Sequence, residues 1–364
     1  MTEIVTIETK SLGDRSYLVS DGEVAAVIDP QRDIDRVLAV AERLGVRITH
    51  VFETHVHNDY VTGGLALARA VGAAYVLSAA ENVDFDHVGV DDDDEIPVGC
   101  FIVRAVHTPG HTPHHMSYVV SEAGRPCAVF TGGSMLYGTV GRTDLIGDDQ
   151  TEELTRAQFR SVRRLAAELP DDVAVQPTHG FGSFCSSTQA SGTDESTIAT
   201  ERTTNVALTV DDEEHFVDTL MSGLTAYPRY YAHMGPRNRQ GPTAPDLSPP
   251  TPVDPVELRR RIHVGDWVVD LRTRQAFAPP TWPAPSMSPW TTSSSPISAG
   301  RSRGAHRSRW SATQPTTWQL RSATWPGSES TDPPARPAAA SASGLRAASC
   351  VHIEGRHSLN WPRR

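Results

Sequence analysis

The first 180 residues of the chain alternate between short apolar runs and amphipathic stretches. Apolar runs of strand length cover residues 4–9, 16–20, 23–29, 48–54, 100–106, 116–120, 127–130 and 172–175. Apolar side chains recur at helical spacing over residues 33–44, 65–71 and 152–168. Strands and helices therefore alternate without a glycine-rich phosphate loop, which predicts a layered α/β domain and not a helical bundle.

The composition is that of a soluble protein. The 364 residues are 38% hydrophobic, which is enough for two domains with ordinary cores. No apolar run approaches the ~18 residues of a membrane-spanning helix, and the N-terminus lacks the apolar core of a signal peptide. We therefore expect a cytoplasmic protein with no membrane partner. The four cysteines are widely spaced without a CxxC pair, which argues against a disulfide framework or a cysteine-based zinc site.

The charge is distributed unevenly along the chain. The net charge is -11, and residues 277–364 contain ten arginines, no lysine and three acids, so this tail carries +7 and the rest -18. Such an acidic first part, without a basic stripe, argues against a nucleic-acid partner. Residues 278–364 are rich in serine, proline and alanine and lack helical or strand periodicity, so we expect a disordered, low-complexity tail.

A proline-rich segment separates the two parts of the chain. Residues 235–255 contain repeated X-Pro steps, which exclude a continuous helix. We therefore predict a first domain over residues 1–239 and a linker over residues 240–255. The opening of a second domain follows over residues 256–277, before the tail at 278–364.

The chemistry is concentrated in four loops, each following a predicted strand. The first loop holds His55, His57 and Asp59, whose alternating spacing lets two imidazoles and a carboxylate converge on one cation. The second loop fixes His111 on a rigid Pro-Gly turn, and the fourth adds His179 after the strand at 172–175.

The third loop contains two consecutive glycines, Gly132 and Gly133, which allow close approach of the backbone. Near it, the turn Gly141-Arg142-Thr143-Asp144 has two interpretations. Arg142 either pairs with Asp144 to fix the loop or attracts an anionic substrate. His114 and His115 are expected to be half-exposed bystanders.

Taken together, the four loops resemble the metallo-β-lactamase superfamily, and more narrowly its persulfide dioxygenases and their fusions with rhodanese domains. The likeness is carried by ETHVHNDYVTGG, TPGHTPHHMSY, FTGGSMLYGTVGRTDL and PTHGFGSFC, and it continues through ERTTNVAL and YAHMGPRNRQGP. It covers about the first 276 residues. It implies an αββα sandwich with the metal at the edge of the sheets.

The resemblance also implies a set of metal ligands. His55 and His111 correspond to the two imidazoles of the dioxygenase iron, but the carboxylate that normally completes the site falls at Gly133. His57 can instead complete a three-histidine site, which favours tetrahedral zinc with a bound hydroxide. Asp59 and His179 remain from a second metal site.

Tyr60 stands where the second metal site would have its other histidine, so we expect one metal ion and not two. Tyr60 either donates a hydrogen bond to a metal-bound ligand or simply packs in the site. The candidate metal ligands are His55, His57, Asp59, His111 and His179, and the candidate catalytic residues are Asp59, Tyr60 and Arg142.

The second domain also resembles a known family. Residues 264–277, VGDWVVDLRTRQAF, are similar to the first strand and helix of a rhodanese domain. Read in a shifted frame, the codons for Thr281 to Gly300 and beyond can encode a stop-free continuation patterned as strand, turn and amphipathic helix. We infer that a one-nucleotide frame change near Ala278 has destroyed a C-terminal rhodanese-like domain.

Three functions stay open from the sequence. The leading hypothesis is a mononuclear Fe(II) dioxygenase that oxidises a low-molecular-weight thiol persulfide to sulfite and thiol. The second is a Zn(II) hydrolase of the glyoxalase II type, in which Asp59 accepts a proton from the water that attacks a thioester. The third is an inactive metal-binding remnant. The sequence does not indicate the oligomeric state.

Overall fold

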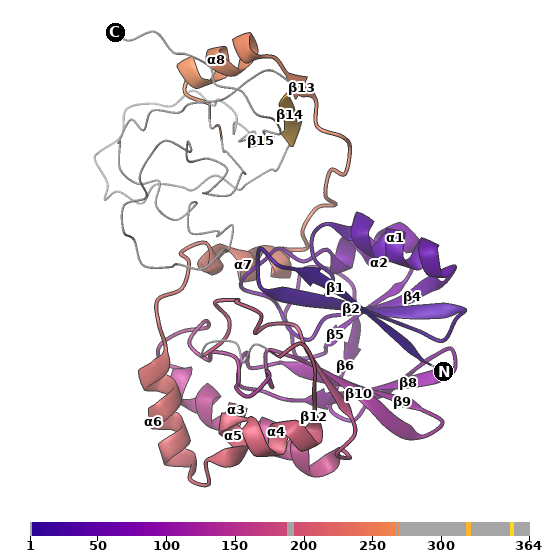
Figure 1. Cartoon of the computed structure of the whole chain (residues 1–364), viewed down its shortest axis with the longest axis vertical. Coiled ribbons are helices and arrows are strands. Elements are labelled where there is room, and N and C mark those ends of the chain that lie inside the picture. The colour runs from indigo at the N-terminus through magenta and orange to yellow at the C-terminus, as the bar shows by residue number, and fades with distance from the viewer. Residues whose placement is uncertain (1, 188–192, 267, 269–317, 322–349, 353–364) are drawn as a thin grey trace. The chain divides into compact units, whose positions relative to one another are not determined.

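The structure is a computed structural model that describes residues 2–187, 193–266, 268, 318–321 and 350–352 (Figure 1). The chain divides into two compact units, and the described part of the first ends at Pro245. The strands of its first sheet, in spatial order, are β1 Glu3–Thr9, β2 Asp14–Ser20, β3 Val24–Ile28, β4 Arg47–Phe52, β5 Ala74–Ser78 and β6 Val88–Val90.

A second sheet has the spatial order β12-β11-β10-β9-β8-β7. Its strands are β7 Glu95–Val98, β8 Phe101–His107, β9 Met116–Glu122, β10 Arg125–Gly132, β11 Ala174–Pro177 and β12 Ser196–Thr197. The helices are α1 Ile34–Leu44, α2 Gly64–Val71, α3 Thr151–Glu168, α4 Ile198–Thr204, α5 Val206–Thr209, α6 Glu213–Gly223 and α7 Tyr231–Gln240.

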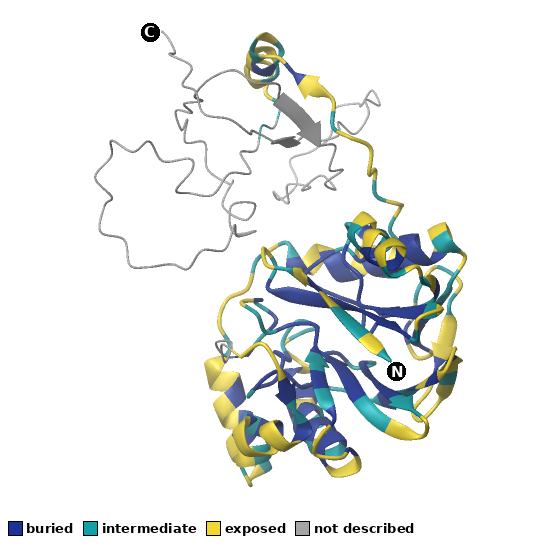
Figure 2. Ribbon diagram, turned by 45° about the vertical axis from the view of Figure 1, so that its right-hand side comes forward, coloured by how far each residue is buried: buried dark blue, intermediate teal, exposed yellow. Residues whose placement is uncertain are grey.

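Three hydrophobic clusters define four layers in this unit. The central cluster lies between the inner faces of the two sheets and includes Phe52, Tyr118 and Phe130. A second cluster packs α1 and α2 against the first sheet, and a third packs α3, α5 and α6 against the second sheet. The helices turn buried faces to the sheets and exposed faces outward (Figure 2). The fold is therefore the αββα sandwich that the sequence predicts.

Parallel pairing places several strand ends together. β3, β4 and β5 run parallel in the first sheet, as do β10 and β11 in the second. The carboxyl ends of parallel strands meet at one edge of a sheet, where loops are free to hold ligands. The motif loops leave from this edge.

The strands and helices predicted from the pattern are all present, with ends that differ by a few residues. Residues 235–255 form no continuous helix, as expected, although α7 continues through Pro236 before it ends at Gln240. Pro236 lies in the second turn of α7, where it removes a single helical hydrogen bond, and the buried side chains of Tyr231, Met234 and Asn238 compensate by packing on the domain.

The second unit begins at Asp246. Its described elements are β13 Pro252–Val253, α8 Pro255–His263, β14 Trp318–Arg321 and β15 Cys350–His352. Asp254 caps α8 by accepting hydrogen bonds from the next turn (both 2.8 Å). Residues 267 and 269–277 of the predicted rhodanese opening, the frame change near Ala278 and most of the tail lie outside the described residues. None of the described helices is both long and apolar enough to cross a membrane.

Candidate metal centre

The candidate ligands converge at the edge where the strands end. His55, His57 and Asp59 follow β4, His111 follows β8, and His179 follows β11. Two groups drawn from these candidates have ligand atoms within 4.8 Å of one another. They are His55 with His111 and His179, and His57 with Asp59 and His179. A third such group joins His57 to Asp29 and Glu53. All five candidate ligands are buried. The structure thus brings together every metal ligand proposed from the sequence.

Hydrogen bonds fix which nitrogen of His55 faces the group. The Thr54 hydroxyl donates to Asp29 Oδ2 (2.7 Å), so its oxygen accepts from His55 Nδ1–H (2.9 Å). This leaves the lone pair on His55 Nε2 for a metal. Burial, reinforced by the nearby His57, lowers the pKa of His55 well below its usual value, so the ring is neutral at pH 7.

His111 is prepared in the same way. Its Nδ1–H donates to the carbonyl oxygen of Arg142 (2.7 Å), which leaves the lone pair on Nε2. Burial and the neighbouring His179 lower the pKa of His111 to about 3. Its Nε2 is buried and has no hydrogen-bond partner among the described residues. A buried nitrogen lone pair without a partner fits a metal ligand.

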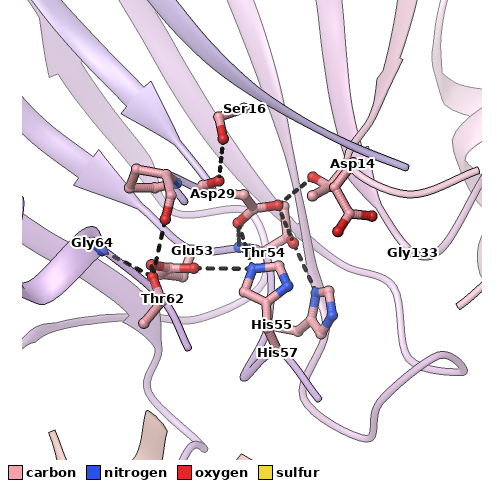
Figure 3. Close-up of polar contacts among 12 residues, drawn as sticks. Asp14, Ser16, Asp29, Glu53, Thr54, His55, His57, Thr62, Gly64 and Gly133 are labelled. Carbon is pink, nitrogen blue, oxygen red and sulfur yellow. Dashed lines mark hydrogen bonds and ion pairs between the residues drawn. The ribbon is translucent and has the colours of Figure 1, made fainter. Parts of the chain in front are cut away.

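His57 is oriented by two carboxylates. Its Nε2 lies 3.0 Å from Glu53 Oε2 and 3.2 Å from Asp29 Oδ1 (Figure 3), while its Nδ1 has no partner in the part of the chain that is described. Burial lowers the pKa of His57, but Asp29 and Glu53 outweigh burial and raise it well above its usual value. Tyr60 stacks on the ring (centroids 4.3 Å apart), and its hydroxyl lies 2.9 Å from Nε2. Packing against His57 is therefore what the geometry shows for Tyr60.

His179 lies between two aspartates. Its Nδ1 is 2.9 Å from Asp14 Oδ1 and 3.3 Å from Asp59 Oδ2, and its Nε2 is 3.4 Å from His55 Nε2. Burial lowers the pKa of His179, but Asp59 and Asp14 together raise it to about 9. Burial and the charge of Asp59 raise the pKa of Asp14 to about 7.

The ring of His111, a candidate metal ligand, fills the space beside Gly133. A Cβ atom at this position would lie 2.2 Å from Cδ2 and 2.7 Å from Nε2 of His111. The backbone N–H of Gly133 donates to His115 Nε2 (3.1 Å). His115 is fully buried, so the expectation that it is half-exposed is wrong, because its ring supports this loop; His114 is half-buried, as expected. The ring of His111 excludes a carboxylate side chain at position 133.

Arg142 is fully engaged within the protein. Its Nε and Nη2 donate to the two carboxylate oxygens of Asp144 (2.6 and 2.7 Å), and its remaining donors reach the carbonyl oxygens of Phe184 and Thr225. The ring of Tyr227 covers the guanidinium, 4.6 Å from Cζ. This is the geometry of the loop-fixing interpretation, and attraction of a substrate by Arg142 stays a prediction.

Sequence reasoning missed Asp14, Asp29, Glu53 and Asn238. Asn238 Nδ2 on α7 donates to the carbonyl oxygens of His57 (2.8 Å) and Tyr60 (2.9 Å), and its Oδ1 accepts from the backbone N–H of Thr62. Glu53 directly follows β4, just before the first motif loop, and Asp29 follows the neighbouring apolar strand β3; these positions at strand ends are a signal that could have found them. Asp14 and Asn238 have no local signal.

The residues present fit one divalent metal ion. The imidazoles of His55, His111 and His179 have ligand atoms within 4.8 Å of one another, and the carboxylate of Asp59 lies beside them. The two groups that contain His179 share that residue, and an ordinary imidazole binds one metal ion, so these two groups suit a single ion. In the third group, Asp29 and Glu53 face His57 Nε2 as its ion-pair partners. Imidazole ligands accept both iron and zinc, so the donor set does not select the metal.

The fold and this buried histidine cluster define a metal-binding α/β sandwich. Residues 15–179 match the family model described as "Metallo-beta-lactamase superfamily". The chain is 30% identical over 203 residues to the human mitochondrial persulfide dioxygenase ETHE1, covering 55% of this chain and 73% of that protein. It is 31% identical over 173 residues to a hydroxyacylglutathione hydrolase of Brucella anthropi, covering 44% of this chain and 62% of that protein.

A solved structure agrees with these similarities. The crystal structure of a metallo-beta-lactamase from Staphylococcus aureus subsp. aureus COL superposes with a TM-score of 0.67 at 28% identity, covering 76% of this chain and 81% of that one. The chain belongs to the metallo-beta-lactamase superfamily.

Proposed function

We propose that the protein is a mononuclear metal-dependent enzyme that oxidises a low-molecular-weight thiol persulfide. The observation that carries the proposal is the sharing of His179 between the group of His55 and His111 and the group of His57 and Asp59, which favours one metal ion for these two groups. A single ion suits an oxygenase better than the two-metal hydrolases of the fold. The similarity to human persulfide dioxygenase supports this substrate class.

The proposed reaction is RSSH + O2 + H2O → RSH + SO3²⁻ + 2 H⁺, in which the outer sulfur is oxidised, the S–S bond breaks and dioxygen is reduced. His55, His111 and His179 would hold the metal, with Fe(II) favoured. The ion, when bound, supplies a place for dioxygen and the persulfide sulfur to meet. The neutral rings of His55 and His111 offer their lone pairs without first losing a proton. The negative charges beside His179 keep it in place.

Oxygen uptake by the full chain tests the proposal. The Fe(II)-loaded protein should consume dioxygen on addition of cysteine persulfide and release sulfite. His111→Ala should abolish both, because it removes a ligand whose lone pair has no other partner. Arg125→Ala is a matched control at a surface ion pair far from the motif loops, and it should leave the rate unchanged. Metal-loaded, folded protein that consumes no oxygen would rule out this reaction.

A zinc-dependent thioester hydrolase is the alternative. It is favoured by the absence of a carboxylate at Gly133, since an all-imidazole set is typical of zinc, and by Asp59, whose buried oxygens have no hydrogen-bond partner among the described residues. In that reaction Asp59 would take a proton from the attacking water. Zn(II)-loaded protein that cleaves an S-acyl thiol, and loses this activity in Asp59→Asn, would favour the hydrolase. A full chain that binds neither metal would indicate the inactive remnant.

A further inference from the structure

Asp14 is a buried carboxylate that the proposed reaction does not use. It is the first residue of β2, it is 1% exposed, and its Oδ1 lies 2.9 Å from His179 Nδ1. Its Oδ2 is also buried and has no hydrogen-bond partner among the described residues. A buried carboxylate oxygen without a partner is costly unless a positive charge stands nearby.

The backbone holds Asp14 against His179 from both sides. Arg15 N–H donates to the carbonyl oxygen of Thr178 (2.8 Å), and Phe181 N–H donates to that of Gly13 (3.1 Å). These two bonds join the residues that flank Asp14 to the residues around His179. Gly13 permits this contact, because its φ is +74° and a Cβ there would lie 2.3 Å from the backbone nitrogen of Ser183.

The contact determines which nitrogen of His179 faces the other ligands. Because Nδ1–H points to Asp14, the other ring nitrogen of His179, Nε2, is directed toward His55 Nε2, 3.4 Å away. The hydrogen bond from Thr54 directs the lone pair of His55 into the same space. Two nitrogen lone pairs at this distance repel each other unless a proton or a cation lies between them. Nε2 of His111 belongs to the same group of ligand atoms as those of His55 and His179.

The missing negative charge of the candidate metal centre also points to Asp14. As metal ligands, the imidazoles of His55, His111 and His179 would bring no negative charge, and the ring of His111 leaves no room for a carboxylate at position 133. We propose that Asp14 positions His179 as the third imidazole of the metal centre and supplies, through that ring, negative charge that no side chain at position 133 can supply. Carboxylates that orient a ligating histidine have this effect in metal sites generally. The inference rests on metal binding by the proposed function and not on its reaction.

The test is metal affinity, measured in the full chain with Co²⁺ alone as the probe, in competition with a chromophoric chelator. Asp14→Asn keeps the size of the side chain and an acceptor for His179 Nδ1–H but removes the charge. It should weaken Co²⁺ binding about 10- to 100-fold. Asp21→Asn is the matched control, because it removes one carboxylate just beyond the other end of β2. It should leave the affinity within about threefold of the parent.

A double-mutant cycle separates positioning from general support of the fold. If Asp14 acts through His179, then Asp14→Asn combined with His179→Ala should bind Co²⁺ within about threefold of His179→Ala alone. The d–d spectrum of bound Co²⁺ should change in Asp14→Asn, because the ligand field of the third imidazole changes. Asp14→Glu restores a carboxylate and should recover part of the affinity.

Three results would overturn the inference. The first is a folded Asp14→Asn protein that binds Co²⁺ as tightly as the parent. The second is a double variant whose loss of Co²⁺ affinity is the product of the losses in the two single variants, and the third is an Asp14→Asn protein with a lower melting temperature but unchanged Co²⁺ affinity. If Asp14→Asn does not fold, parent-like Co²⁺ affinity in folded His179→Ala would overturn it as well. A parent that binds Co²⁺ but consumes no oxygen would refute the proposed reaction alone.

Discussion

Adding a single carbon at Gly133 should damage the metal centre. In Gly133→Ala the new Cβ would lie 2.2 Å from Cδ2 and 2.5 Å from Cγ of His111, distances at which carbon atoms cannot coexist. The ring can move away only by giving up its 2.7 Å hydrogen bond to the carbonyl oxygen of Arg142. Overpacking of this kind costs about 1–3 kcal/mol, and the lost hydrogen bond adds about 1 kcal/mol.

Two assays follow this cost. The midpoint of thermal unfolding should fall by about 2–4 °C for each kcal/mol. Co²⁺ affinity should fall at least about tenfold, because a displaced ring that must return to bind the metal passes at least 1.4 kcal/mol of strain to the site. Gly223→Ala is the matched control, since its Cβ would meet nothing closer than 3.8 Å, and it should be neutral.

The outcome also decides whether the ring of His111 is what prevents a carboxylate at position 133. If Gly133→Ala is as stable as the parent and binds Co²⁺ as tightly, then His111 does not depend on the space above Gly133 and the reasoning fails. Gly133→Asp makes the same test more severe. If it gained affinity, the usual carboxylate of the family would fit this centre after all, and His111 would have to adopt another position.

Three further predictions concern residues around the centre. Asn238→Ala should lower the free energy of unfolding by about 2–4 kcal/mol in urea, because it leaves the carbonyl oxygen of His57 and two further backbone groups without partners; a loss below 0.5 kcal/mol would contradict this. Arg142→Lys should lower the free energy of unfolding by about 1–3 kcal/mol but leave KM unchanged, since a lysine cannot pair with Asp144 through two donors; a raised KM with unchanged stability would instead support attraction of substrate. Backbone N–H groups of Val24 and Glu23 lower the pKa of Asp21 to about 2, so its contribution is present above the unfolded value near 4 and is lost as the pH falls toward 2. Asp21→Asn should therefore cost about 1 kcal/mol at pH 7, after allowance for solvent screening, and nothing at pH 2; a pH-independent cost in urea titrations would show that the charge is not the cause.

Local patterns account for most of what the sequence predicted. The periodicity of apolar residues predicted a layered α/β domain, and the resemblance of the motif loops predicted the αββα sandwich. The spacing of His55, His57 and Asp59 predicted that these side chains lie together, because it depends on residues close together in the chain. Asp14 and Asn238 were not predicted, because they reach His179 and His57 across 165 and 181 residues. Those contacts form only when the fold brings β2 and α7 against the motif loops.

Separation in the sequence also explains why the tautomers of His55 and His111 could not be predicted. Which nitrogen of His111 is available depends on the carbonyl oxygen of Arg142, and which nitrogen of His55 is available depends on Asp29 acting through Thr54. The half-exposed environment expected for His115 failed for a related reason. A histidine beside a proline-rich turn gives no sign that a glycine from another strand will donate its N–H to the ring.

The position of Asn238 bears on the order in which the protein matures. Asn238, close to the end of the first unit, donates hydrogen bonds to the loop that contains His57. A nascent chain whose α7 is still inside the ribosome therefore lacks these hydrogen bonds. Contacts between residues so distant in sequence carry a large loop-closure cost and form late in folding. Metal would then enter a nearly complete fold.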